Sequence, residues 1–197
     1  MDSTMAVAQR MTAAQYLTQE DDRRLTNLVD GEVVVTDPLA LHQRVLFDLA
    51  FALQAWCRSA PGRGETTLPI DVLLDEHNCF APDVLWYREG RGPGRAVVRP
   101  QALPDIAAEI RSPSTWRHDI GPKMARYEQY GLPELWLVDT AADEVLVYRR
   151  STPRAPTFDV SLELARGDAL TSPLLPGFAL PIDELFGTEP PPAPATG

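Results

Sequence analysis

Three residues in the middle of the chain have the types and spacing that metal-dependent phosphoryl chemistry requires. Asp83 follows Pro82 at the start of one strand-like segment, and Glu109 ends another. Two carboxylates from neighbouring strands, complemented by a backbone carbonyl such as that of Ile110, could hold Mg²⁺, which prefers oxygen ligands. Lys123 follows in the next segment and could deprotonate or orient a metal-bound water, or stabilise charge on phosphorus oxygens.

Lys123 is the only lysine of the chain, since the other 17 of the 18 basic residues are arginine. A lysine kept in such an arginine-rich chain suggests a need for a compact ammonium group whose pKa can shift, which arginine does not provide. A helix N-terminus and nearby cations would lower this pKa, whereas carboxylates would raise it. The sequence leaves the direction open, and an ordinary surface lysine is the alternative.

Each of these signals is weak when taken alone. Pro82 and Asp83 form a dipeptide that is common in turns. Glu109 carries more information, because it lies in an apolar run that predicts a buried strand, where a carboxylate is costly unless it is paired or bound to metal. Arg111 or Arg126 could be its partner in a purely structural role.

The composition predicts one soluble domain. With 197 residues, 44% of them hydrophobic, the chain can bury an ordinary core, and we expect the domain at 11–187, an N-terminal extension at 1–10 and a disordered tail rich in Pro and Ala at 188–197. No signal peptide or apolar run of membrane-spanning length is present, so a cytoplasmic location without membrane contact is expected. Cys57 and Cys79 suggest neither a disulfide framework nor a metal site.

The formal net charge of −10 argues against binding to nucleic acid, but the charge is unevenly distributed. Residues 82–130 contain eight basic and six acidic residues, a local charge of +2. DNA could therefore be bound if a homodimer pools two such basic faces or if a partner delivers the DNA.

Apolar periodicity and turn residues predict an α/β or α+β fold in which helices pack on a sheet. The expected elements are a helix at 12–23, a hairpin at 24–36 that turns at Asp30 and Gly31, a long helix from 37 or 38 to before Pro61, strands at 66–74, 81–87, 106–110, 134–139 and 144–149, a loop rich in Gly and Pro at 88–104, and a helix at 119–130 whose first turn contains Pro122.

Several motifs in this order resemble one bacterial family from about Met11 to Phe186. They are PDV, EIRSPST, D-x₃-K-x₃-Y-x₃-G and ELWLVD, together with DGE at 30–32, His42 at the start of the long helix, and LPGF at 175–178. This pattern resembles the Uma-type restriction endonuclease family, a branch of the PD-(D/E)XK nuclease superfamily. The EIRSPST and K-x₃-Y-x₃-G segments are specific when they occur together, whereas Pro-Asp and Asp-Gly-Glu alone are not.

The resemblance implies a restriction endonuclease-like fold, with a central mixed sheet flanked by helices, and Mg²⁺-dependent hydrolysis of phosphodiester bonds in DNA, with Mn²⁺ as a possible substitute. Asp83 would be the acid of the first motif and Glu109 the acid of the second. The superfamily expects a lysine two positions after the second acid, where this chain has Arg111, which stays protonated. In this family the lysine is expected from the following helix, where Lys123 lies.

Other residues of these motifs are accessory candidates, each with a structural alternative. Glu32 could add a third carboxylate or be an exposed hairpin residue, and His42 could contact phosphate or begin the helix, partly buried against the hairpin. Asp119 could cap its helix or pair with Lys123. Tyr127, one turn beyond Lys123, could orient that side chain or belong to the core.

Arg117 and His118 are candidate phosphate contacts.

The sequence is compatible with two functions from different classes. The first is an endonuclease in which Asp83 and Glu109 hold the metal and Lys123 assists. The second is a catalytically inactive protein of nuclease fold that binds a protein partner, in which the three residues form only a buried ion-pair cluster.

Overall fold

The computed structural model describes residues 10–19, 26–94 and 100–187. The predicted tail at 188–197 and, apart from Arg10, the predicted N-terminal extension lie outside these residues, as does the 95–99 part of the predicted loop.

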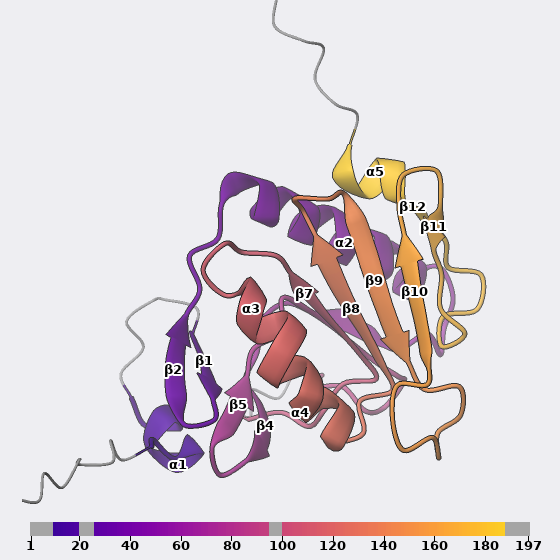
Figure 1. Ribbon diagram of the computed structural model, residues 1–197. Coiled ribbons are helices and arrows are strands. Elements are labelled where there is room, and N and C mark those ends of the chain that lie inside the picture. The colour runs from indigo at the N-terminus through magenta and orange to yellow at the C-terminus, as the bar shows by residue number, and fades with distance from the viewer. Residues whose placement is uncertain (1–9, 20–25, 95–99, 188–197) are drawn as a thin grey trace, which may run out of the picture.

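A six-stranded mixed sheet forms the centre of the molecule (Figure 1). Its strands in spatial order are β10 (Val160–Leu164), β9 (Glu144–Arg149), β8 (Glu134–Asp139), β7 (Ile106–Ile110), β6 (Val84–Tyr87) and β3 (Glu65–Thr67). Strands β7 and β8 pair in parallel and the other neighbours pair antiparallel. The predicted strands at 106–110, 134–139 and 144–149 are confirmed.

Helices cover both faces of this sheet (Figure 1). The long helix α2 (Ala40–Arg58) packs on one face, where its buried Leu49 joins a core cluster with Ile110 of β7. On the other face, Ala107 of β7 packs with Tyr127 of α4 (Met124–Gln129). Side chains alternate along a strand, so Glu109 shares the face of Ala107 and lies on the α4 side.

A smaller antiparallel sheet stands beside the central one (Figure 1). Its strands in spatial order are β2 (Glu32–Val35), β1 (Thr26–Val29), β5 (Asn78–Phe80) and β4 (Val72–Asp75). The predicted hairpin is confirmed, since Asp30 and Gly31 connect β1 to β2 with φ angles of 48° and 80°. Two consecutive positive φ angles are typical of the tight turn that matches the twist of a hairpin.

The remaining elements lie at the ends of the described chain. They are α1 (Ala13–Leu17), the short pair β11 (Ala169–Leu170) and β12 (Leu180–Pro181), and α5 (Ile182–Phe186). Thr12 is the N-cap of α1, as predicted, and forms a capping box with Gln15.

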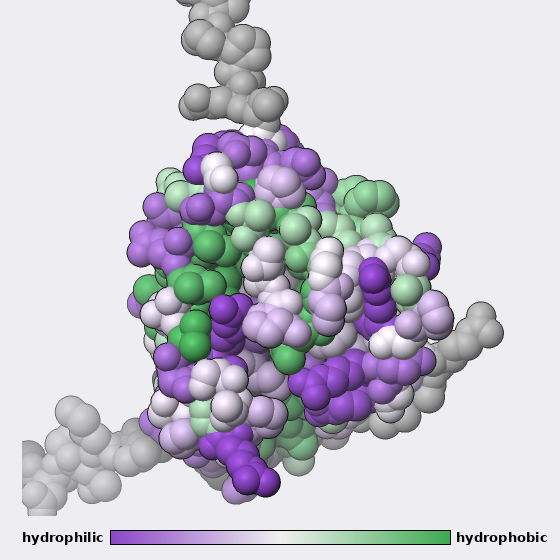
Figure 2. All heavy atoms as spheres, turned by 90° about the vertical axis from the view of Figure 1, so that its right-hand side faces the viewer, coloured by the Kyte–Doolittle hydropathy of each residue, from purple (hydrophilic) through white to green (hydrophobic). Residues whose placement is uncertain are grey.

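Figure 2 views the side of the molecule nearest β10 to β12, where hydrophobic residues lie mainly between hydrophilic upper and lower ends.

The single strand predicted at 66–74 is wrong. Its ends belong to β3 in the central sheet and β4 in the smaller sheet, and β5 follows as an unpredicted strand. Pro69 lies between β3 and β4. A proline cannot donate a ladder hydrogen bond, so the apolar run crosses from one sheet to the other at this point.

The helix predicted at 119–130 begins three residues earlier and is broken into three pieces. They are α3 (Trp116–His118), the kinked segment η1 (Asp119–Lys123) and α4. Gly121 interrupts the helical backbone with φ −117° and ψ −105°, and Pro122 lies inside the run instead of in its first turn. Proline removes a helical hydrogen bond and clashes with the preceding turn, which accounts for a break at this position.

The arrangement confirms the predicted α+β architecture with a mixed sheet between helices. Across residues 10–19, 26–94 and 100–187, the helices are too short or too polar to span a membrane.

The packing of α2 predicts where stability is concentrated. Leu49 is fully buried against the sheet, whereas Phe51 on the same helix is 66% exposed. Leu49→Ala should lower the free energy of unfolding by about 2–5 kcal/mol because it leaves a cavity. Phe51→Ala should change it by less than about 0.5 kcal/mol. Urea denaturation of both variants measures the difference, and equal losses would contradict this packing.

Candidate active site

Strand pairing brings the two predicted metal ligands together. Val84 of β6 is opposite Ala108 of β7. Asp83 precedes Val84 and Glu109 follows Ala108, so the antiparallel register places these two acids opposite each other. Both line one narrow pocket on the α4 side of the sheet, together with Lys123.

Asp83 is held in place through one of its carboxylate oxygens. Its Oδ2 accepts a hydrogen bond from the backbone N–H of Ile110 at 2.7 Å and lies 3.2 Å from Nε2 of His42. His42 is 2% exposed in the first turn of α2, and its Nδ1 has no hydrogen-bond partner among the described residues. The structure thus joins His42 to the predicted metal ligand and leaves Oδ1 of Asp83 without a hydrogen bond from the described chain.

Glu109 is likewise held through only one of its two carboxylate oxygens. Its Oε1 accepts a hydrogen bond from the hydroxyl of Tyr127 at 2.6 Å and lies 2.7 Å from Nζ of Lys123. Within the described ranges its Oε2 has no such partner. Tyr127 is fully buried in the core cluster of this face. It contacts Glu109 and therefore orients the carboxylate on which Lys123 also acts.

The broken helix positions Lys123. Asp119 and Lys123 stand four residues apart, at the two ends of η1, and Nζ donates to Oδ1 of Asp119 at 2.9 Å. The other oxygen of Asp119 accepts a hydrogen bond from the hydroxyl of Thr115 at 3.3 Å. Asp119 thus pairs with Lys123, one of its two predicted roles, and the ammonium lies between two carboxylates.

Three carboxylates and one ammonium in a buried pocket make proton uptake favourable. Burial raises the pKa of Glu109 to about 8; Lys123 opposes the rise, while Asp119 and Asp83 add to it. Burial lowers the pKa of Lys123, but the adjacent Asp119 and Glu109 outweigh this effect and raise the pKa above its usual value. Lys123 is therefore protonated at neutral pH.

The β1–β2 hairpin contributes residues that the sequence analysis missed. The residues that line the pocket are Asn27, Thr36, Ala81, Asp83, Glu109, Ile110, Thr115, Asp119 and Lys123. Asn27 and Thr36 belong to the hairpin from which Glu32 was proposed as a third acid. Asn27 and Val29 are two residues apart and therefore lie on the same face of a strand. Val29 is buried in the α4-side cluster, so this spacing was the signal that could have indicated Asn27.

Two accessory candidates lie away from the pocket lining. Glu32 is exposed at the turn end of the hairpin, which agrees with its structural alternative. Arg111 forms two hydrogen bonds with Asp139, at 2.8 and 2.9 Å, and lies over the ring of Trp116. The arginine in the usual lysine position is thus occupied elsewhere.

The donor set of the pocket fits Mg²⁺ or Mn²⁺. Asp83 and Glu109 each keep one oxygen without a hydrogen bond from the described chain, and Ile110 also lines the pocket. Residues 10–19, 26–94 and 100–187 contain no group of three or more His, Cys, Asp or Glu side chains arranged to hold a metal ion. Two carboxylates and a carbonyl suffice for these ions, which leave other positions to water and substrate phosphate.

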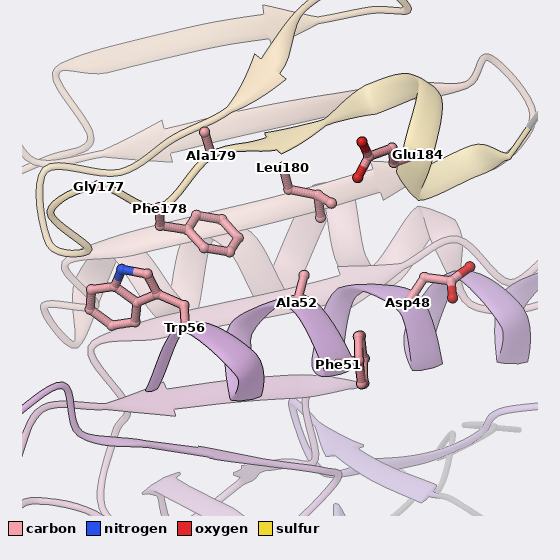
Figure 3. A pocket seen from close by; sticks show the side chains of 9 residues that line it. All are labelled: Asp48, Phe51, Ala52, Trp56, Gly177, Phe178, Ala179, Leu180 and Glu184. Carbon is pink, nitrogen blue, oxygen red and sulfur yellow. The ribbon is translucent and has the colours of Figure 1, made fainter. Parts of the chain in front are cut away.

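A second hollow lies away from these residues. Figure 3 shows it between α2 and the segment 177–184, with Trp56 and Phe178 at one end and Asp48 and Glu184 at the other. Its lining has no lysine or histidine beside the two acids. It therefore lacks the convergence of acids and a cation seen around Glu109.

The raised pKa of Glu109 predicts how the stability of the metal-free protein depends on pH. Between its ordinary value of 4.5 and about 8, folded Glu109 holds a proton that the unfolded chain has lost. The free energy of unfolding should therefore fall as pH rises through this window, by at most about 1.4 kcal/mol per pH unit.

Chemical denaturation at several pH values in the presence of a chelator measures this slope. Glu109→Gln cannot lose the proton and should flatten the profile. A Gln variant with the same slope as the wild type would show that another group is responsible.

Comparisons with known proteins bear on the fold and the family of the chain. A crystal structure described as that of a putative nuclease belonging to DUF820, from Anabaena variabilis ATCC 29413, superposes with a TM-score of 0.76. It is 16% identical, and the match covers 89% of this chain and 97% of the other. At this identity the likeness concerns the fold, which is that of the predicted nuclease family.

A search of curated proteins found no match. The model of the Uma2 family, described as "Putative restriction endonuclease", matches residues 13–183, which contain every predicted site residue. This match supports a nuclease function in general terms. The chain belongs to the Uma2 family.

Proposed function

We propose that this protein is a Mg²⁺-dependent endonuclease that hydrolyses phosphodiester bonds in DNA. The observation that carries the proposal is the convergence of Asp83, Glu109 and Lys123 in one pocket. One oxygen of each carboxylate has no hydrogen bond from the described chain, and the ammonium lies beside them. Membership of a family described as "Putative restriction endonuclease" supports the nuclease part of this proposal.

The residues of the pocket have different proposed roles. Asp83 and Glu109 would hold the ion, which when bound supplies Lewis-acid chemistry and lowers the pKa of water. His42 and the Ile110 N–H fix Asp83, as Tyr127 fixes Glu109.

Lys123 remains protonated in the metal-free pocket, so it acts as a cation that stabilises negative charge on the phosphoryl oxygens. In this state it has no free electron pair with which to accept a proton. The structure therefore favours the electrostatic role over the base role.

DNA binding needs positive charge beyond the pocket, and much of the basic segment is already paired. Arg88 and Arg91 both contact the buried Asp105. Arg126 pairs with Asp30, at 2.6 Å. These pairs reduce the field that one protein copy offers to phosphates, which supports the proposal that a homodimer pools two faces or that a partner delivers the DNA.

Arg117 differs from these arginines. It is exposed next to the residues that position Lys123, and its one hydrogen bond within the described residues is donated by Nε to Nε2 of His118, at 3.3 Å. We propose both residues as phosphate contacts beside the pocket.

A non-catalytic interaction module is the second candidate function. The observation that favours it is the burial of the ion-pair cluster, in which Glu109, Asp119 and Lys123 are each 3% exposed. A closed cluster of this kind could serve structure alone. Metal binding separates the two candidates, because only the endonuclease requires it.

Asp83→Asn tests the metal site with little disturbance of the fold. The amide oxygen can still accept the Ile110 N–H, but the negative charge is lost. Wild-type protein should bind Mg²⁺ or Mn²⁺ at millimolar-order concentrations in calorimetry and nick plasmid DNA. Asp83→Asn should lose both properties, whereas Glu32→Ala, which removes an exposed carboxylate outside the pocket, should keep them.

Lys123→Met separates metal binding from turnover in the same assays. It removes the cation but retains an unbranched side chain, so metal binding should persist while turnover falls by about 10²–10³-fold. A wild-type protein that neither binds metal nor cleaves single-stranded or plasmid DNA would favour the interaction module.

A further inference from the structure

We propose that Asn27 is a substrate-binding residue whose side-chain amide donates a hydrogen bond to a phosphate oxygen of the bound DNA. The inference rests on the proposed nuclease function and deepens it by adding a neutral donor to the charged residues of the pocket.

The fold places Asn27 on the wall of the pocket. It lies on β1 opposite Val34 and on the same face as Val29, which packs in the cluster of Tyr127. Asn27 is only 5% exposed and lines the pocket with Asp83 and Glu109. The smaller sheet therefore brings one polar side chain against the acids of the central sheet.

The orientation of the Asn27 amide follows from one hydrogen bond. The backbone N–H of Ala81 donates to Oδ1 of Asn27 at 2.7 Å. A backbone N–H can only donate, so the contacting atom must be the oxygen, and the NH₂ group occupies the other position. This NH₂ has no acceptor among the described residues, yet it is not one of the fully enclosed unpaired atoms. Because Asn27 lines the pocket, we infer that this NH₂ faces it.

The two other buried side chains of the pocket that carry donors, Lys123 and Thr115, already contact its acids. Lys123 donates to Asp119 and lies against Glu109, and Thr115 donates to Asp119. A phosphate in the pocket would lie near acidic oxygens, so an additional donor would favour its binding. The NH₂ of Asn27 can donate without adding charge, and it cannot ligate a metal. Its chemistry thus matches a non-bridging phosphate oxygen.

Asn27→Asp tests the donor while preserving the structural role of the side chain. The new carboxylate still accepts the Ala81 N–H, but it replaces the NH₂ with a second oxygen. Asn27→Ala removes the donor without adding charge, and thermal denaturation verifies that it is folded. A hydrogen bond to a charged group contributes enough for both variants to lower kcat/KM for plasmid cleavage by about 10- to 100-fold.

Two controls test whether an effect of Asn27→Asp comes from altered metal binding or from the added charge. Calorimetry with Mn²⁺ should show that Asn27→Asp binds the ion as tightly as wild type or more tightly, because a carboxylate has been added. Gln54→Glu makes the same change in charge on α2, about 18 Å along the helix from His42, and should leave cleavage unchanged.

The outcomes distinguish this assignment from the proposed function. Active wild-type protein with reduced kcat/KM in both Asn27 variants supports it. Active wild type with Asn27→Ala within twofold of normal overturns the assignment and leaves the nuclease intact, even if Asn27→Asp is impaired, because the effect is then one of charge. Wild-type protein that cleaves no DNA overturns the nuclease and the assignment together.

Discussion

The burial of three carboxylates around a single ammonium is the constraint on which the rest of the site depends. Negative charges that lie close together in a buried pocket are costly. Specific donors therefore hold each acid. Asp83 is held by Ile110, and Glu109 by Tyr127 and Lys123. In the metal-free pocket, burial favours a proton on Glu109. A divalent cation would offset the same excess of negative charge, which links the electrostatics of the pocket to its proposed chemistry.

Much of this site could be predicted because its signals are local. Glu109 stood in a short apolar run, Lys123 was the only lysine, and both belonged to motifs of one family. The hairpin was a different case. Its turn was evident from Asp30 and Gly31, but which face of β1 meets the pocket depends on packing between two sheets. The prediction therefore named Glu32 and overlooked Asn27.

The predicted bounds of strands and helices were wrong where contacts distant in sequence decide the path of the chain. The run at 66–74 has strand character throughout, yet its two halves pair with different sheets. The helical run from Trp116 continues past a proline, because the backbone kinks at Gly121, and Asp119 and Lys123 come together across this kink. The basic character of 82–130 was likewise reduced by acids distant in sequence, as with Asp139 and Arg111. Counting charges along the chain cannot detect such pairs.

The proposed nuclease activity requires Asp83 and Glu109 to bind one divalent metal ion together. Crystals soaked in Mn²⁺ and measured near the manganese absorption edge test it directly, because anomalous scattering locates the ion without reference to activity. One anomalous peak is expected in the pocket, within bonding distance of an oxygen from each acid. A peak elsewhere, or no peak at saturating Mn²⁺, would rule out this shared site.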